Sequence, residues 1–179
     1  MTQIAVNYAH ALYDLALQEQ LTKQILQQLR SLDAGIAAEP AFLRLLTAPN
    51  VSKEERCDII HRSFRDQVHP YVLNFLKLLT EKGYARHFPD CCKAYEELYN
   101  KDNGILPVTV VTPKALTEAQ SRRLMEKLWE LTGKQILLKY RLDPECLGGI
   151  RLLYDGKQVD GTVRSRLETV GKLLKNTVL

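Results

Sequence analysis

The hydrophobic pattern of this chain changes its period once, close to residue 104. Before that point apolar residues recur at the three- and four-residue spacing of amphipathic helices, and after it they alternate with polar residues, as in half-buried strands. The change coincides with Asn103-Gly104, a dipeptide typical of turns. With 179 residues the chain has room for two small domains. The pattern therefore predicts a mainly α protein with a smaller α/β part: a six-helix bundle over residues 1–104, then a small α/β domain over residues 105–179.

Turn and capping residues mark the ends of most helices in the first half. The expected helices span residues 4–19, 22–38, 42–46, 52–64, 71–82 and 84–101. Thr22 is expected to be an N-cap, and Ser52 with Glu55 forms a capping-box pattern. Gly83 is expected to end the fifth helix. Pro89 falls inside the sixth, which should therefore kink or start late.

The second half is expected to contain a strand, a helix, three strands and a last helix. Their ranges are 107–112, 117–131, 135–142, 150–154, 157–159 and a helix with an apolar stripe at Val163, Leu167, Val170 and Leu174. Asp155-Gly156 predicts a two-residue hairpin turn, in which both residues need a positive φ. Asp160 or Thr162 is expected to cap the last helix.

Composition is that of a soluble globular protein, with 45% hydrophobic and 26% charged residues. No apolar stretch is long enough to span a membrane, and the start does not resemble a secretory signal. The four cysteines show no CxxC spacing, so free thiols in a reducing compartment are expected.

Charge is distributed unevenly between the two halves. Residues 1–104 carry 12 Lys and Arg against 13 Asp and Glu, whereas residues 105–179 carry 13 against 8. The net charges are therefore −1 and +5. This asymmetry supports two domains and suggests an acidic partner for the second.

The helices over 4–19 and 71–82 have unusually wide apolar arcs. At about 100° per residue, they cover roughly 240° and roughly 220°. A helix on the surface of a bundle needs an apolar stripe of only ~100° or somewhat more. Each helix is therefore either central in its own bundle or buries a second face against another chain, and the pattern alone leaves both possibilities open.

Catalytic and cofactor motifs are missing from the sequence. There is no Walker-type loop and no Gly-x-Gly-x-x-Gly, so no phosphate site is predicted. The four histidines lie far apart without a metal-ligand spacing. No nucleophile elbow brings Ser, His and Asp together. We therefore expect no enzyme, no metal site and no cofactor.

The most specific pattern lies between residues 142 and 167. Gly148-Gly149 leads into a strand, the Asp155-Gly156 turn follows, and residues 160–167 read Asp-Gly-Thr-Val-Arg-Ser-Arg-Leu. This segment resembles the C-terminal signature of the delta subunits of F-type ATP synthases, whose mitochondrial counterpart is the oligomycin-sensitivity-conferring protein. The start, which reads Tyr-Ala-His-Ala-Leu-Tyr over residues 8–13, is similar to the start of that family. The resemblance runs from residue 4 to about residue 175.

The resemblance implies one partner for each domain. In the family, the first and fifth helices form a groove for the N-terminal amphipathic helix of an alpha subunit, and Tyr8 and Leu78 match groove positions. Their neighbours by helical angle complete the expected site: Ala5, Ala9, Leu12, Tyr71 and Phe75. The C-terminal domain is implied to bind the b subunits of the peripheral stalk. The residues expected there, as structural or stalk-facing residues, are Gly149, Asp160, Gly161, Arg164 and Arg166.

The resemblance implies a non-catalytic stator subunit of a proton-translocating F-type ATP synthase, linking the catalytic head to the peripheral stalk against rotor torque. It is expected to bind no nucleic acid, to form no obligate homo-oligomer, and to be membrane-associated only through the complex, at the cytoplasmic face of a bacterial plasma membrane. The alternative is a nucleic-acid-binding adaptor that uses the basic C-terminal half. Against it, Tyr140 and Tyr154 alternate with aliphatic neighbours, so no aromatic stacking platform is evident.

Overall fold

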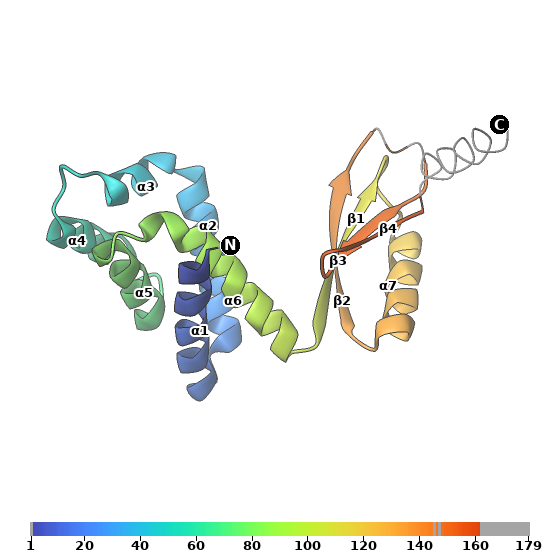
Figure 1. Ribbon diagram of the computed structural model, residues 1–179, viewed down its shortest axis with the longest axis horizontal. Helices are drawn as coiled ribbons and strands as arrows, with labels where there is room; N and C mark the ends of the chain where they lie inside the picture. The colour runs from blue at the N-terminus through green and yellow to red at the C-terminus, as the bar shows by residue number, and fades with distance from the viewer. Residues whose placement is uncertain (1, 145, 147, 162–179) are drawn as a thin grey trace, which may run out of the picture. The chain divides into compact units, whose positions relative to one another are not determined.

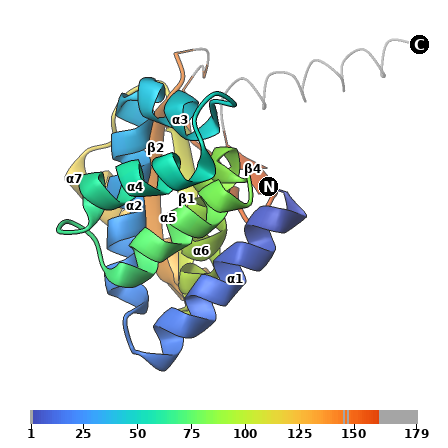
Figure 2. The same ribbon diagram turned by 90° about the vertical axis from the view of Figure 1, so that its left-hand side faces the viewer.

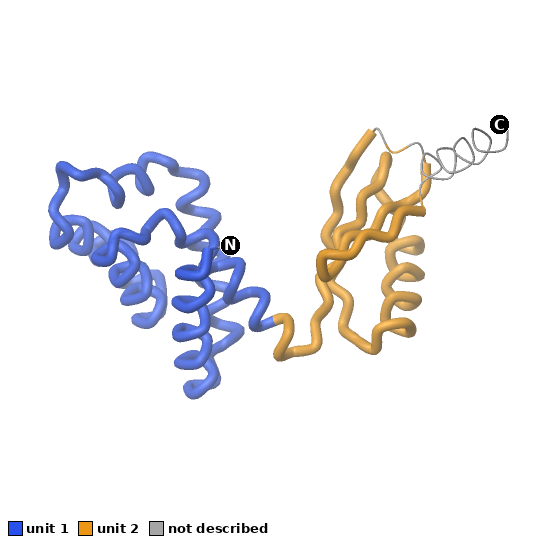
Figure 3. The backbone as a smooth tube through the Cα atoms, in the orientation of Figure 1, with its two compact units in different colours: residues 1–99 blue, residues 100–179 orange. Residues whose placement is uncertain are grey.

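The structure is a computed structural model that describes residues 2–144, 146 and 148–161. It is mainly helical and contains a small four-stranded sheet (Figure 1). The chain divides into two compact units, residues 1–99 and 100–179 (Figure 3), and each is described by itself. The division falls before the end of a helix, somewhat earlier than the expected boundary after residue 104.

Unit 1 is built from helices. In chain order these are α1 (Gln3–Gln18), α2 (Thr22–Ala38), α3 (Pro40–Thr47), α4 (Lys53–Phe64), α5 (Pro70–Glu81), the short 3-10 helix η1 (Ala85–His87) and α6 (Phe88–Asp102). Of these, α1, α4 and α5 start with a side-chain cap at Thr2, Ser52 and His69. The capping box of α4 is confirmed: the Glu55 amide donates to the Ser52 hydroxyl at 3.1 Å, and the Ser52 amide donates to the Glu55 carboxylate at 3.0 Å. These hydrogen bonds lower the pKa of Glu55.

Two expectations about helix starts are corrected or resolved by the structure. Thr22 is not an N-cap, because α2 already begins there; the cap position belongs to Leu21, which has no side-chain hydrogen bond to offer. Pro89 is the second residue of α6, where the missing amide hydrogen costs no helical hydrogen bond. The sixth helix therefore starts late rather than kinking at Pro89.

The core of unit 1 lies where α1, α2, α5 and α6 meet, with α4 beside α5 (Figure 2). Tyr95 of α6 is its largest fully buried side chain. Its ring packs edge-on against Tyr13 of α1 at 5.2 Å, and its hydroxyl donates to the carbonyl oxygen of Thr22 on α2 at 3.2 Å. One side chain thus ties three helices together.

Unit 2 contains a four-stranded sheet with one helix against it. Its elements are β1 (Ile105–Thr112), α7 (Glu118–Thr132), β2 (Gln135–Leu142), β3 (Arg151–Tyr154) and β4 (Lys157–Asp160), and the strand order is β2-β1-β3-β4. β1 and β2 are parallel and joined through α7, whereas β3 pairs antiparallel with β1 and β4. Leu124 and Leu128 of α7 pack on Leu106, Val108 and Val110 of β1.

β1 begins at Ile105, two positions before Pro107, the first residue of the expected strand. Pro107 has no amide hydrogen to donate to a neighbouring strand. In the described register, β3 pairs only with Thr109–Val111, so β1 has a free edge on that side at Pro107. A missing amide hydrogen is tolerated at such an edge.

The hairpin turn between β3 and β4 is confirmed. Asp155 and Gly156 have φ values of 45° and 69°, as a two-residue turn of this kind requires. Gly148 and Gly149, with φ values of 73° and 79°, also lie in the left-handed region that favours glycine. The expected last helix, with its apolar stripe from Val163 to Leu174, lies outside the described residues.

The cysteine side chains are free thiols. Cys91, Cys92 and Cys146 are buried, and Cys57 is half-buried. Burial raises the pKa of Cys91 to about 12 and also raises the pKa of Cys92. These thiols stay protonated at neutral pH, which makes them poor nucleophiles. Among the described helices, none is both long and apolar enough to cross a membrane.

Candidate functional site

The residues expected to bind a partner helix on α1 and α5 divide into two groups. Ala5, Ala9, Leu12 and Phe75 belong to the core of unit 1, with exposed fractions of 0%, 0%, 5% and 6%. Most of the two wide apolar arcs is therefore buried by the chain itself, as expected for helices that are central in their own bundle. These four side chains lie beneath the surface of unit 1 and do not form part of it.

Tyr8, Tyr71 and Leu78 form the second group and remain accessible. Tyr8 and Tyr71 are half-buried, and Leu78 is 40% exposed. On an α-helix at about 100° per residue, Tyr71 and Leu78 lie within roughly 20° of each other on α5, on its partly exposed flank. The accessible part of the predicted set is thus aromatic on α1 and both aromatic and aliphatic on α5.

Residues 84–88, from the end of α5 to the start of α6, contact both α1 and α5. The Tyr8 ring of α1 packs edge-on against Tyr84 at 6.0 Å, and the Phe75 ring of α5 lies 6.4 Å from Phe88. Near the start of α1, the Thr2 hydroxyl lies 3.4 Å from Nδ1 of His87. Residues 84–88 therefore connect the Tyr8 side of α1 with the Phe75 side of α5.

Three further apolar residues share the Tyr8 flank of α1 and were not singled out from the sequence. Ile4 is half-buried, Ala11 is exposed, and Leu15 is 38% exposed. Together with Tyr8 they recur at i, i+4, i+7 and i+11, the spacing of one helical flank. Their spacing along the helix is enough to place these residues on one flank from the sequence.

In unit 2, the described stalk-facing candidates have local structural roles. Asp160 accepts a hydrogen bond from Nε of Arg151 at 3.0 Å, across the β3–β4 pair. The Gly161 amide donates to the carbonyl oxygen of Ile150 at 3.0 Å, and an added Cβ there would approach that oxygen to 3.3 Å. Gly149 is exposed and needs its positive φ. Arg164 and Arg166 lie outside the described residues.

A groove between α7 and β2, of about 720 Å³, was not foreseen from the sequence. Met125, Tyr140 and Leu142 line it, and Trp129 follows Met125 by one helical turn. Tyr140 and Leu142 share the face of β2 that packs under α7, so strand alternation alone predicts them to be buried. They remain 53% and 62% exposed because α7 does not cover that end of the edge strand.

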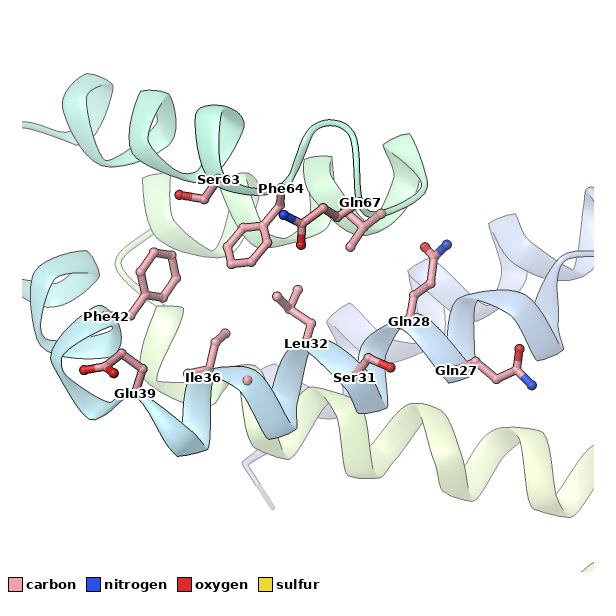
Figure 4. A pocket seen from close by; sticks show the side chains of 12 residues that line it. Gln27, Gln28, Ser31, Leu32, Ile36, Glu39, Phe42, Ser63, Phe64 and Gln67 are labelled. Atoms are coloured by element: carbon pink, nitrogen blue, oxygen red, sulfur yellow. The ribbon is translucent and has the colours of Figure 1, made fainter.

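A second unforeseen cavity, of about 500 Å³, lies between α2, α3 and the end of α4 (Figure 4). Leu32 and Ile36 rise from α2 towards it, and the rings of Phe42 and Phe64 pack edge-on at 5.5 Å. Gln28, at its rim, accepts a hydrogen bond from the His69 amide at 2.6 Å. This cavity is separate from the α1 and α5 residues described above.

Gly35 also lines this cavity, and its replacement by alanine is expected to stabilise unit 1 by about 0.5 to 1 kcal/mol. The residue lies inside α2, and an added Cβ would meet no atom within 4 Å. Urea denaturation of the full chain measures the effect. Gly83→Ala is the control: the space is equally open, but its φ of +78° opposes a side chain. Stabilisation by both substitutions, or by neither, would contradict this explanation.

In the part of the chain that the structure describes, no group of three or more His, Cys, Asp or Glu side chains could hold a metal ion. The surfaces that stand out are apolar and suited to other proteins. The profile of the family described as ATP synthase delta (OSCP) subunit matches residues 4–174.

The chain belongs to this family.

Individual relatives agree over nearly the whole chain. ATP synthase subunit delta of Alkaliphilus oremlandii is 30% identical over 176 residues, which cover 98% of each protein. Subunit delta of Clostridioides difficile is 29% identical, over 98% of this chain and 97% of that protein. A chain in the structure of the Toxoplasma gondii mitochondrial ATP synthase hexamer superposes with a TM-score of 0.78 at 18% identity, over 97% of this chain and 98% of that chain. At that identity, the structural match shows a shared fold.

Family membership establishes the class of function. The chain is a non-catalytic, structural subunit of ATP synthase that belongs to its stator, and it works as part of a membrane-bound complex. The comparisons give no support to a nucleic-acid-binding adaptor.

Proposed function

We propose that this chain links the catalytic head of ATP synthase to the peripheral stalk, with one partner for each unit. The bundle of α1–α6 binds the amphipathic N-terminal helix of an alpha subunit. Unit 2 binds the b subunits of the stalk, at the cytoplasmic face of a bacterial plasma membrane. Together the two interfaces hold the head still while the rotor turns.

The observation that carries the head-binding part is the accessible apolar flank on α1 and α5. The inner faces of both helices are already buried, yet Tyr8, Leu15 and Leu78 keep part of their surface in solvent. A partner helix with apolar residues at i, i+3, i+4 and i+7 presents a matching stripe. Burying these side chains against it removes apolar surface from water, at about 25 cal/mol per Å².

The proposed head-binding site separates contact residues from supporting residues. The contact residues are Ile4, Tyr8, Ala11, Leu15, Tyr71 and Leu78. Ala5, Ala9, Leu12 and Phe75 lie beneath them in the core of unit 1. Because Ala5 and Ala9 are small and fully buried, they let α1 pack closely on its neighbours and so fix the position of Tyr8.

The stalk-binding part of the proposal is supported by charge. Residues 105–179 carry the net charge of +5, which suits an acidic helical partner. Gly149, Asp160 and Gly161 shape the backbone around β3 and β4. Arg164 and Arg166 belong to the same proposal as cationic contacts.

The head-binding proposal is tested by titrating the full chain with a synthetic peptide of the alpha subunit N-terminus in a calorimeter. Saturable binding of one peptide per chain is expected. A peptide with the same composition in scrambled order is the control, because it lacks the apolar stripe. If the folded chain takes up neither peptide, or both equally, the proposed head contact is wrong.

A further inference from the structure

The cavity between α2, α3 and the end of α4 has the size and the lining of a small-molecule site (Figure 4). Its volume of about 500 Å³ lies within the usual range of ligand pockets. Leu32 and Ile36 of α2 form a floor that belongs to the core of unit 1. Phe42, Phe64 and Val68 line it as half-buried apolar walls. A ligand with an apolar body would therefore remove apolar surface from water on both sides of the contact.

Contacts between neighbouring elements close both ends of this cavity. At one end the Phe42 and Phe64 rings pack edge-on at 5.5 Å and join α3 to α4. At the other end Oε1 of Gln28 accepts the hydrogen bond from the His69 amide at 2.6 Å, which joins α2 to the N-cap of α5. A partner helix needs a groove that stays open over its anchors from i to i+7. The closed ends therefore favour a compact molecule over a helix.

The polar groups of the lining select an uncharged ligand. Glu39 is the one charged residue in the described lining, and because it is exposed, water screens its charge. The other polar groups are neutral amides and hydroxyls, from Gln27, Gln28, Gln67, Ser31 and Ser63. Such groups donate to and accept from uncharged polar atoms. A ligand anion would find no cationic side chain among these described residues to pair with.

A glycine lies at the middle of the arc that α2 presents to the cavity. At about 100° per residue, the α2 residues of the lining span roughly 180°, from Gln27 to Ile36, and Gly35 lies close to the centre of that arc. An added Cβ at Gly35 would meet no atom within 4 Å. Glycine inside a helix is less favourable than alanine, so this position gives up helix stability. A large side chain here would occupy the cavity, and the glycine leaves that space for a ligand.

We propose that this α2/α3/α4 cavity binds an uncharged, mostly apolar small molecule of about two to three rings, with a polar group directed at the rim amides. The site is separate from the head and stalk contacts proposed above. A molecule bound there touches α2, α3 and α4 at once, so it is expected to raise the unfolding temperature of the chain.

The test uses N-phenyl-1-naphthylamine, an uncharged aromatic probe whose emission rises in apolar surroundings. Titration into the full chain is expected to give a saturable rise for one probe per chain. The 8-sulfonate of the same molecule is the matched ligand control and is expected to bind at least tenfold more weakly, because it is an anion. Non-specific adsorption would favour the sulfonate instead, since the chain carries a net charge of +4.

Two substitutions on α2 fill the cavity and test its location. Gly35→Phe and Ser31→Phe, one helical turn apart on the lining, are each expected to weaken binding of the uncharged probe at least tenfold. Ala37→Phe is the control: it adds the same ring at an exposed position about 160° around α2 from Gly35 and should change the affinity less than twofold. Gly35→Ala alters helix propensity but adds only a methyl group, so less than a threefold change is expected. Circular dichroism checks that each variant is folded.

The proposal is overturned if the folded chain gives no saturable signal with the uncharged probe, or if it takes up the sulfonate equally well. It is also overturned if Gly35→Phe and Ser31→Phe bind the probe as tightly as the wild-type chain, or if Ala37→Phe weakens binding as much as they do. If Gly35→Phe does not fold, Ser31→Phe decides the location of the site by the same criterion.

Discussion

Replacing Tyr95 by alanine is expected to lower the free energy of unfolding of unit 1 by about 3 to 5 kcal/mol. The side chain is fully buried, packs edge-on against Tyr13, and donates a hydrogen bond to the Thr22 carbonyl oxygen. Its removal leaves a cavity between α1, α2 and α6 and deletes the hydrogen bond that ties α6 to the start of α2. Urea denaturation followed by far-ultraviolet circular dichroism measures the loss.

Tyr95→Phe separates the two contributions. It keeps the ring and removes only the hydroxyl, so the expected loss is about 1 kcal/mol. If the alanine and phenylalanine variants are destabilised equally, the hydrogen bond rather than ring packing dominates, and the proposed role of the ring is wrong. If the alanine variant fails to fold and the phenylalanine variant folds, the result agrees with the expectation.

Replacing Tyr8 by alanine is expected to weaken binding of the alpha-subunit peptide by about 2 kcal/mol, or about thirtyfold. Tyr8 is half-buried against Tyr84, at the point where residues 84–88 connect α1 with α5. A partner helix on this flank would cover the rest of its ring. Calorimetric titration of the full-length variant measures the change.

Leu17→Ala is the control for Tyr8→Ala. Leu17 is 50% exposed and lies on α1, but on the opposite flank, about 180° from Tyr8. Its replacement should leave the peptide affinity within a factor of two. Equal losses for both variants would mean that the peptide does not select the Tyr8 flank.

Local signals were enough to predict most helix and strand positions. The range 22–38 for α2 and the range 135–142 for β2 agree with the structure. The capping box at Ser52 depends on residues three positions apart, so a short stretch of sequence contains the whole interaction. The Asp155-Gly156 turn is equally local.

The expected N-cap role of Thr22 is wrong for a reason that no local signal reveals. Gln20 has a φ of 57°, in the left-handed region, although it is not glycine. The Leu21 amide donates back to the Ala16 carbonyl oxygen at 2.8 Å, which makes the α1–α2 junction very tight. The helix therefore starts without the side-chain cap that Thr22 suggested.

Site residues were harder to predict than elements, because exposure depends on neighbours distant in sequence. The helical angle correctly groups Ala9 and Leu12 on one face of α1, but it does not say which element covers that face. The structure shows that the chain itself covers it. Conversely, alternation assigns Tyr140 and Leu142 to the buried face of β2, yet α7 leaves that end uncovered. Only the tertiary packing distinguishes these cases.

The most direct test of the central claim is whether the chain bridges the head and the stalk. A catalytic head prepared without this subunit is mixed with the soluble b segment, with and without the chain, and the assemblies are weighed by native mass spectrometry. A complex of head, chain and b segment is expected only when the chain is present, and Tyr8→Ala should deplete it while leaving the chain bound to the b segment. If the head and the b segment compete for the chain, or associate equally well without it, the bridging role is contradicted.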